Sequence, residues 1–212
     1  MDEAGITWGR RRVLAGLMAA LLLVAAPTIA AQEAAEAPAA IIRGTVDRVI
    51  AVLADTSVSE VARRRQVRAI IGEHFDFVAM SKRVLATNWS KADKEQRKRF
   101  TSLFRELLSN TYWRRISAYT NETVSYTGSR LRSDSQATVT TVINTATADI
   151  PVDYMLYARN GRWLAYDVVI EQVSLVRNYR GSFQDIVHQH GIDGLIKQLE
   201  VKVAETSAAA AE

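Results

Sequence analysis

The sequence predicts an α+β fold in which helices come first, a curved antiparallel sheet of about four strands follows, and helices close the chain. Apolar residues recur at helical spacing up to Tyr119. From Thr123 to Ile170, β-branched and other apolar residues alternate with polar ones, as in strands. Helical spacing returns after Ser174. Helices and strands are therefore segregated along the chain, which excludes a parallel βαβ arrangement.

Composition narrows both the architecture and the function. The chain has 212 residues with 48% hydrophobic content, which suits one compact unit with a single good core. Its formal net charge is +4, and basic and acidic residues are interspersed, so we expect no nucleic-acid partner. There is no cysteine, which excludes disulfides and thiolate metal sites. Stability must therefore come from packing.

The N-terminal 31 residues are typical of a secretory signal peptide. Arg10, Arg11 and Arg12 precede an apolar run of 14 residues from Val13 to Ala26, and Pro27 and small residues follow. The run is shorter than the roughly 20 residues of a membrane-spanning helix. We expect cleavage after Ala30 or Ala31, with export by the general secretory route or, given the arginine run, the twin-arginine route.

Two low-complexity segments flank the expected folded domain. Residues 32–40 are rich in Ala, Glu and Pro, and residues 204–212 are similarly poor in apolar periodicity. We predict that the first is a disordered linker and the second a disordered tail. The folded domain is then expected over residues 41–203.

Four helices are predicted before the sheet. The first ends near Asp55, and the second begins at a cap at Ser57 or Ser59 and runs toward Phe75. Asp76 is expected to cap a short third helix. The fourth begins with a capping-box pattern formed by Ser90 and Asp93. Its apolar residues follow the i, i+3, i+4, i+7 rule: Phe100, Leu103, Phe104, Leu107, Leu108, Tyr112, Ile116 and Tyr119.

The strands and the closing helices follow from the same kind of pattern. Strands are expected over Thr123 to Thr127, Ala137 to Ala146, Ile150 to Tyr157 and Trp163 to Ile170. After the sheet, Ser174 is expected to cap a helix that stops at Gly191, and Asp193 to begin a last one.

The last two strands should form a hairpin with apolar residues on both faces. Asn160 and Gly161 favour a two-residue type I′ turn, which pairs Tyr154 with Asp167 and Val152 with Val169. One face then carries Val152, Tyr154, Leu156, Ala165 and Val169. The other carries Met155, Tyr157, Leu164, Tyr166, Val168 and Ile170. We therefore expect burial on both sides, by helices on one face and by helices or a ligand cavity on the other.

Candidate catalytic and metal-binding groups are poorly placed. His188 and His190 are two residues apart on a helix and point in different directions, and His74 stands alone. The expected register places Asp153 on the face opposite Asp167 and Glu171, so no carboxylate pair forms. No nucleotide-binding or nucleophile motif occurs in the sequence. We therefore expect neither an enzyme nor a metal or cofactor site.

Five segments, in order, resemble the MlaC-type periplasmic phospholipid carriers, the toluene tolerance family of the Mla pathway. The resemblance covers about residues 39 to 203. It rests on FDFVAMSKRVLATNW, on Gln96 with Phe100 and Phe104, on Trp163 with Tyr166 and Asp167, on Val173 with Ser174, and on GIDGL from Gly191 to Leu195.

This resemblance implies a soluble periplasmic carrier whose curved sheet and helices enclose an apolar pocket for phospholipid acyl chains. Its implied role is to shuttle lipid between an outer-membrane lipoprotein–porin complex and an inner-membrane ABC transporter complex, which maintains outer-membrane lipid asymmetry. Two positions depart from the family pattern, because Gln172 and Ala86 stand where glycine is usual. Such departures are compatible with a branch that carries hopanoids or other polycyclic lipids.

The pocket-lining residues expected on these grounds are Leu85, Phe104, Leu108, Tyr112, Val152, Tyr154, Val169 and Val173. Two other functions stay open at this point. One is a cavity enzyme of the ketosteroid-isomerase-like fold, with Asp167 and Tyr154 as acid and base. The other is a periplasmic adaptor that binds only protein and has no cavity.

Overall fold

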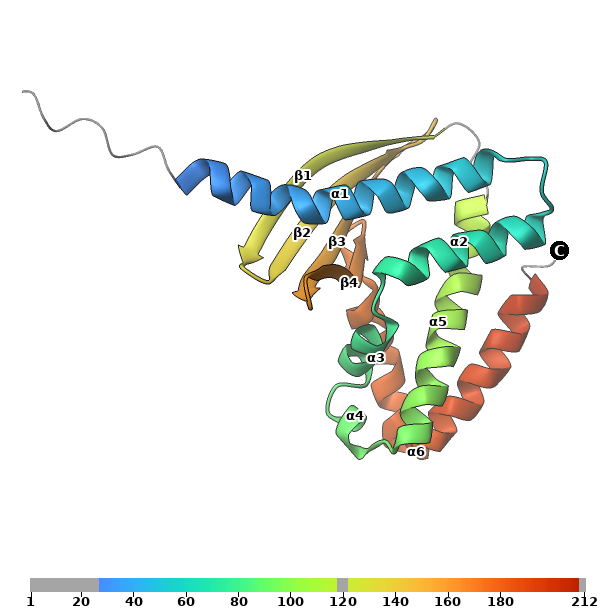
Figure 1. The fold of residues 1–212 in the computed structure, drawn as a ribbon. Coiled ribbons are helices and arrows are strands. Elements are labelled where there is room, and N and C mark those ends of the chain that lie inside the picture. The colour runs from blue at the N-terminus through green and yellow to red at the C-terminus, as the bar shows by residue number, and fades with distance from the viewer. Residues whose placement is uncertain (1–26, 118–121, 210–212) are drawn as a thin grey trace, which may run out of the picture.

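The computed structural model describes residues 27–117 and 122–209, and the side chains of 37–117 and 122–208. Most of the expected signal peptide, residues 1–26, lies outside the described residues. Within the described residues, five helices precede a five-stranded antiparallel sheet, and a bent helix follows it (Figure 1). The predicted α+β class with segregated elements is confirmed.

Helix α1, Pro27–Ala54, is longer than the sequence analysis predicted. Residues 32–40, which the sequence predicted to be a disordered linker, lie within this helix. Alanine and glutamate favour helix even without apolar periodicity. The side chain of Pro38 is fully buried and Ala39 packs against the core, so part of the segment also has a partner to pack on.

Of the next four helices, α2, α3 and α5 begin close to where the sequence predicts, and the short α4 was not predicted. Helix α2, Glu60–His74, is capped by Ser59, whose hydroxyl accepts from the amide of Ala62. Helix α3, Phe77–Leu85, is capped by Asp76, and the short α4, Asn88–Lys91, follows it. Helix α5 spans Lys94–Ser117. Its capping box is formed by Asp93 and Gln96, not by Ser90 and Asp93 as predicted. The amide of Gln96 donates to the Asp93 carboxylate at 2.8 Å, and the amide of Asp93 donates to the side-chain carbonyl of Gln96 at 3.0 Å.

The sheet is a meander in which each strand pairs with the next. Its strands are β1, Thr123–Ser133; β2, Gln136–Asn144; β3, Asp149–Arg159; β4, Arg162–Ile170; and the two-residue β5, Val173–Ser174. The turn between β3 and β4 has positive φ at both Asn160 and Gly161, as the predicted type I′ turn requires. The free edge of β4 is also met by Phe75, through a parallel bridge to Ala165.

A β-bulge at Tyr166 changes the hairpin register. The predicted register holds from the turn to Leu156, which pairs with Ala165. Beyond it the prediction is wrong by one residue, because Met155 pairs with Asp167, Tyr154 with Val168, and Val152 with Ile170. The extra residue moves Val168 and Ile170 onto the face of Tyr154 and transfers Val169 to the opposite face.

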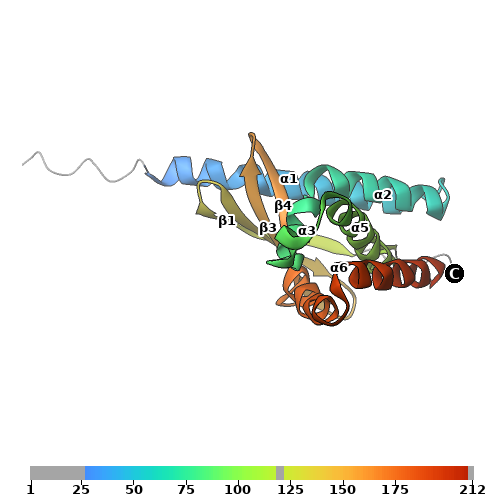
Figure 2. The ribbon, with the colours of Figure 1, turned by 90° about the horizontal axis from the view of Figure 1, so that it is seen from below.

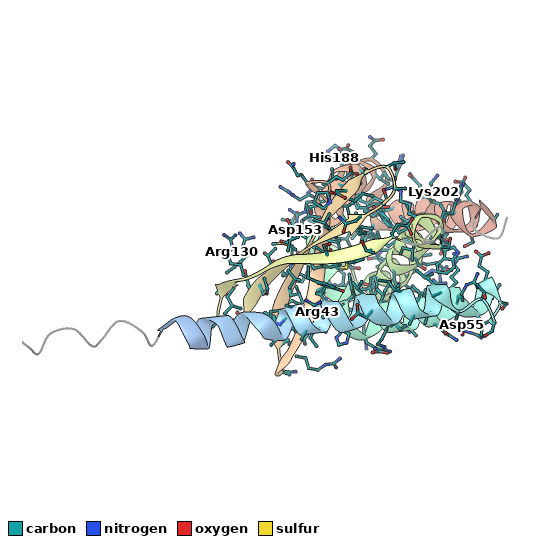
Figure 3. The ribbon with its side chains drawn as sticks, turned by 90° about the horizontal axis from the view of Figure 1, so that it is seen from above. Arg43, Asp55, Arg130, Asp153, His188 and Lys202 are labelled. Carbon is teal, nitrogen blue, oxygen red and sulfur yellow. The ribbon has the colours of Figure 1, made fainter. Side chains whose placement is uncertain are left out.

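Helices cover one face of the sheet, and α1 lies across it (Figures 1 and 3). On that face Val139, Leu156 and Ala165 pack with Ile42 of α1 in one cluster, while Val152 and Val168 join a larger cluster with α3, α5 and α6. Burial of the hairpin on both faces was predicted, but the opposite face is mostly half-buried: Met155, Tyr157, Leu164, Tyr166 and Val169.

Helix α6, Leu175–Ala209, closes the fold against α5. Ser174 caps it as predicted, because its hydroxyl accepts from the amide of Arg177 at 3.0 Å. The helix bends at Gly191, where φ is 67° and ψ is −176°. The tail expected to be disordered from residue 204 is helical to Ala209, which corrects that prediction. Asn110 explains part of the order, because its buried amide donates to Thr206 and Ser207.

Candidate functional site

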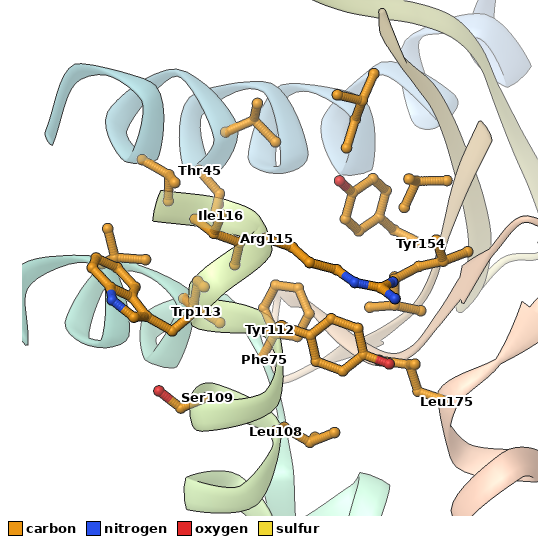
Figure 4. Close-up of a pocket in the computed structure, with 18 of the residues that line it drawn as sticks. Thr45, Phe75, Leu108, Ser109, Tyr112, Trp113, Arg115, Ile116, Tyr154 and Leu175 are labelled. Atoms are coloured by element: carbon orange, nitrogen blue, oxygen red, sulfur yellow. The ribbon is translucent and has the colours of Figure 1, made fainter. Parts of the chain in front are cut away.

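An apolar cavity of about 400 Å³ lies between the covered face of the sheet and helices α1, α2 and α5 (Figure 4). Figure 2 shows α1 and α2 side by side, where they form one wall of this space. The apolar residues that line it are Ile42, Val46, Val49, Ile50, Leu53, Val67, Ile71, Phe75, Phe77, Met80, Leu108, Tyr112, Trp113, Ile116, Val124, Ile143, Ile150, Val152, Tyr154, Val168, Ile170 and Leu175.

Local periodicity places these side chains on the cavity. In α1 the lining residues Ile42, Val46, Val49 and Leu53 are spaced by three or four, so they form one stripe. In the sheet, the bulged register puts Val152, Tyr154, Val168 and Ile170 on a single face. A helix stripe thus faces a strand face, and their side chains leave space between them instead of interlocking.

Four of the eight predicted pocket residues line this cavity. Leu108 and Tyr112 lie one turn apart on α5, and Val152 and Tyr154 lie opposite them on β3. They come from segments about 40 residues apart in sequence, counted from Tyr112 to Val152.

The other four do not line the cavity. Leu85 and Phe104 are buried in the helical core, where the Phe104 ring lies 5.3 Å from that of Tyr179. Val169 is on the opposite face of the sheet because of the bulge. Val173 is 54% exposed on β5, so its place where strand meets helix does not put it at the cavity.

Sequence reasoning missed the α1 stripe and the β4 residues Val168 and Ile170. The spacing of Val46, Val49 and Leu53 by three or four residues is visible in the sequence and indicates a helix. It does not indicate a cavity, because a stripe that faces a core and one that faces a cavity have the same spacing. No local signal in the sequence marks the bulge that redirects the β4 residues.

Polar groups gather at one end of the cavity. Glu122, Thr145 and Glu171 line it, at the start of β1, just after β2 and just after β4. The register brings these positions to the same end of the sheet, because Thr123 pairs with Asn144. Arg115, in the last turn of α5, is a further lining residue. Thr45, Arg68, Arg105 and Ser109 also line the cavity, so its wall is mostly apolar but carries polar groups in more than one place.

Two phenols belong to the cavity wall. Burial raises the pKa of both Tyr112 and Tyr154, and the positive charge of Arg115 acts in the opposite direction on Tyr112. Both phenols are therefore neutral at physiological pH. Neutral phenols add polarity without charge to a wall that is otherwise apolar.

Asp167 takes no part in the cavity. Its carboxylate accepts from the amides of Val168 and Val176, at 2.9 and 3.1 Å, and from the hydroxyl of Ser174 at 2.5 Å. These bonds tie β4 to the start of α6. Because Asp167 pairs with Met155 on the face opposite Tyr154, the two residues do not form an acid–base pair.

Metal-ligand clusters and membrane spans were also sought within residues 27–117 and 122–209. This part of the chain contains no group of three or more His, Cys, Asp or Glu side chains that could hold a metal ion. His188 and His190 are exposed on α6. None of the described helices is both long and apolar enough to cross a membrane.

Sequence comparisons connect this architecture to known proteins. The chain is 26% identical over 126 residues to a toluene tolerance protein, Ttg2D, of Pseudomonas putida, which covers 58% of this chain and 59% of that protein. It is 23% identical over 129 residues to the intermembrane phospholipid transport system binding protein MlaC of Haemophilus influenzae, with 58% and 60% covered. The matched region thus spans about three fifths of each relative's length.

Comparisons with solved structures and with family models agree with these sequence similarities. A phospholipid-binding protein from Ralstonia solanacearum, solved in complex with a phospholipid, has a TM-score of 0.74 at 25% identity and matches 79% of this chain and 97% of its own. The family model described as MlaC protein matches residues 43–201, which run from the second half of α1 into α6 and contain every element between them. The chain belongs to the MlaC family.

Proposed function

We propose that the protein is a soluble periplasmic lipid carrier that holds the acyl chains of a phospholipid in the cavity between α1, α2, α5 and the sheet. The observation that carries the proposal is the cavity itself, about 400 Å³ in volume with an almost wholly apolar wall. Cavities of this size fall within the range of small-molecule sites. The phospholipid in the related Ralstonia solanacearum structure supports the choice of ligand.

The energetics of acyl chains explain why a carrier needs such a cavity. Each CH₂ group removed from water contributes about 0.8 kcal/mol, so a lipid with two long chains cannot cross an aqueous space unshielded at a useful rate. A wall formed by side chains such as Val152, Ile170 and Leu108 supplies an apolar surface of the same character. The lining offers contact without directional bonds, which suits transport better than reaction.

The same site argues against a cavity enzyme. The pair considered for acid–base chemistry was Tyr154 and Asp167, and these side chains lie on opposite faces of the sheet. Tyr154 faces the cavity as a neutral phenol with a raised pKa, whereas Asp167 is engaged by three donors of β4, β5 and α6. We propose a binding protein without catalytic residues.

Location and partners follow from the N-terminal pattern and from family membership. The signal-peptide pattern of residues 1–31 supports export to the periplasm. In our proposal the protein exchanges lipid with an outer-membrane lipoprotein–porin complex and an inner-membrane ABC transporter complex. Through them it maintains the lipid asymmetry of the outer membrane.

The test is the lipid content of purified protein. Protein beginning at Gln32 is produced in a Gram-negative host, and its organic extract is analysed by mass spectrometry. We expect stoichiometric phospholipid. A polycyclic lipid in place of phospholipid would support the hopanoid alternative, and the repeated absence of any lipid from folded protein would refute the carrier proposal.

A pair of tryptophan substitutions ties the lipid to the cavity. Val49→Trp adds a ring to the cavity wall on α1, so it should lower the lipid content by occupying acyl-chain space. Val61→Trp makes the same substitution on α2 at a side chain that is 76% exposed and does not line the cavity. It should leave the lipid content unchanged. Equal lipid content in the two variants would show that the lipid is not bound in this cavity.

A further inference from the structure

Helices α1 and α2 form a hairpin that is fixed to the sheet at one end (Figures 1 and 2). Ile42 of α1 is 1% exposed and packs in one cluster with Leu156 and Ala165 of the sheet. Just after α2, Phe75 forms a β-bridge with Ala165, and the amide of Asp76 donates to the Ala165 carbonyl at 2.9 Å. Apolar burial and backbone bonds thus hold this end, the base of the hairpin, to β3 and β4.

The two helices of the hairpin are also tied to each other. They pack side by side, and Arg48 of α1 forms a bidentate pair with Glu73 of α2, with N···O distances of 2.5 and 2.9 Å. Two parallel bonds of this kind fix the relative orientation of the groups that they join. We therefore expect α1 and α2 to move as one unit.

Away from the base, α2 meets α5 through polar side chains. Pairs join successive turns of the two helices: Glu60 with Trp113 at 2.9 Å, Arg64 with Asn110 at 2.6 Å, and Arg68 with Glu106 at 3.9 Å. The guanidinium of Arg105 also donates to the backbone carbonyl of Arg68 at 3.4 Å. Together these contacts form the α2–α5 seam.

The α2–α5 seam is a thin part of the cavity wall. Arg68 lines the cavity, and 35% of its side chain is also exposed to solvent. Trp113 lines the cavity too, and its indole nitrogen donates to the exposed Glu60. At the seam, therefore, only one or two side chains separate the cavity from solvent.

The seam should open at less cost than the base of the hairpin. Exposed polar groups that separate can bond to water instead, so their net loss is small. When Arg64 leaves the buried Asn110, the amide nitrogen of Asn110 stays bonded to α6. Separation at the base, in contrast, would expose the fully buried side chains of Ile42 and Leu156 and lose their apolar burial. Local opening begins where exposed polar contacts hold the structure, which here is the seam.

We propose that the α1–α2 hairpin is a flap that opens at the α2–α5 seam, and that lipid enters and leaves the cavity through this opening. The inference rests on the proposed carrier function and adds the route by which lipid reaches the site. Opening moves the apolar stripe of α1, from Val46 to Leu53, away from α5 and exposes the cavity along its side. A lipid with two chains can then pass sideways between α2 and α5, so its chains need not thread through one end of the cavity.

Two glycines provide a matched pair of variants. Gly72 of α2 and Gly44 of α1 are both exposed inside helices, so alanine favours the helix equally at each position. A Cβ atom at Gly72 would lie 2.8 Å from a guanidinium nitrogen of Arg105, which must move and lose its bond to Arg68. A Cβ atom at Gly44 meets no atom of the described neighbouring segments within 4 Å. Gly72→Ala therefore loosens the seam without removing any of its groups, and Gly44→Ala leaves it intact.

The first measurement is the rate at which a fluorescent phospholipid passes from loaded protein to vesicles of dioleoyl phosphatidylcholine. Gly72→Ala should release the lipid about three to ten times faster than wild type, as expected when one hydrogen bond of the closed form is lost. Gly44→Ala should release it at the wild-type rate. The melting temperatures of both variants should not fall below that of wild type, because each alanine strengthens its helix.

The second measurement ties the seam shut. The chain contains no cysteine, so an introduced pair of cysteines can be joined selectively by a short bismaleimide. Arg68→Cys with Glu106→Cys spans the seam, whereas Arg48→Cys with Glu73→Cys joins α1 to α2 within the flap. In lipid-loaded protein, the cross-link across the seam should nearly abolish release, compared with the same variant before cross-linking. The cross-link within the flap should leave release unchanged.

Other outcomes overturn the flap in distinguishable ways. Unchanged release after the seam is cross-linked, or equal release by Gly72→Ala and Gly44→Ala, would refute the seam as the route and leave the carrier function standing. Equal slowing by both cross-links would refute the flap, because α1 and α2 would then not move as one unit. Failure of every protein, wild type included, to take up the fluorescent phospholipid would refute the carrier function itself.

Discussion

Ala86 ends helix α3 in a backbone conformation that ordinarily belongs to glycine. Its φ is 50° and its ψ is −121°, and its amide still donates to the carbonyl of Lys82 at 3.0 Å. A side chain in this region costs about 1 to 3 kcal/mol unless the surroundings impose it. In the MlaC-type pattern described above, glycine is usual at this position. The backbone angle explains why glycine is favoured there.

Ala86→Gly should therefore stabilise the protein by about 1 kcal/mol, because the strain of the Cβ atom outweighs the greater backbone entropy of glycine in the unfolded chain. Urea denaturation of both proteins measures the difference. Ala51→Gly is the control, since Ala51 is an exposed residue inside α1, where the substitution should destabilise by about 1 kcal/mol. A loss of stability in Ala86→Gly would show that this angle carries no strain.

At the scale of elements, the bulge at Tyr166 decides which β4 residues meet the cavity. A strict alternation from the Asn160 turn places Val169 on the cavity face, whereas the bulge places Val168 and Ile170 there. The turn, the strand limits and the alternating pattern were predictable because each is encoded within a few residues. The bulge was not, because no local signal in the sequence marks it; it lies next to Ala165, which Phe75 and Asp76 meet from a distant part of the chain.

Two neighbouring substitutions test the bulge. Ile170→Glu places a carboxylate in the cavity, so under the proposed function it should expel the acyl chains, because an unpaired charge cannot remain beside them without water. Val169→Glu places the same group on the opposite, half-buried face and should leave lipid content near that of wild type. Lipid extraction and thermal melting are measured for both. If Val169→Glu lost its lipid and Ile170→Glu kept it, the unbulged register would be correct.

Helix α6 depends on a single glycine for its bend. Gly191 has φ 67° and ψ −176°, a combination that is essentially restricted to glycine. The bend lets the first half of α6 pack near α3 and the second half run along α5 (Figure 1). The sequence predicted that one helix stops at Gly191 and another begins after it, and the non-helical backbone angles of Gly191 confirm this interruption.

Gly191→Ala should destabilise the protein by about 1 to 3 kcal/mol, even though an added Cβ atom at this position meets no other atom within 4 Å. The cost lies in the backbone angle alone. Gly181→Ala provides the contrast, because Gly181 lies in the regular part of α6 with equally open space. It should stabilise by about 0.4 to 1 kcal/mol. Chemical denaturation curves that shift in the same direction for both variants would contradict this account.

At the scale of the whole molecule, the sequence predicted the fold class better than the cavity. Periodicity assigns a residue to a face, and that is enough to order the helices and strands. It does not show whether the face meets other side chains or an empty space, so Phe104 and Leu108, four residues apart on α5, were both assigned to the pocket. Phe104 packs against Tyr179 and Phe183, and Leu108 lines the cavity.

A protein with an apolar cavity should be less stable when the cavity is empty. Under the proposed function, lipid bound at about 100 times its Kd adds about 2.7 kcal/mol, which for a chain of this size raises the melting temperature by about 5 to 10 °C. Delipidated protein should therefore melt lower than protein as purified, and added phospholipid should restore the difference. Identical melting curves for loaded and delipidated protein would contradict this linkage.

The residues that line the cavity run from Ile42 to Leu175, which sets an order of events during biosynthesis. The first lining residue, Ile42, emerges from the ribosome well before Ile170 and Leu175, which complete the opposite wall. Until those residues are in place, the apolar stripe of α1 has no opposite wall. Contacts between segments this far apart in sequence also form slowly compared with local helices. An incomplete chain therefore has no enclosed cavity that can hold lipid. Under the proposed function, lipid uptake by a newly made molecule therefore waits until the opposite wall has formed.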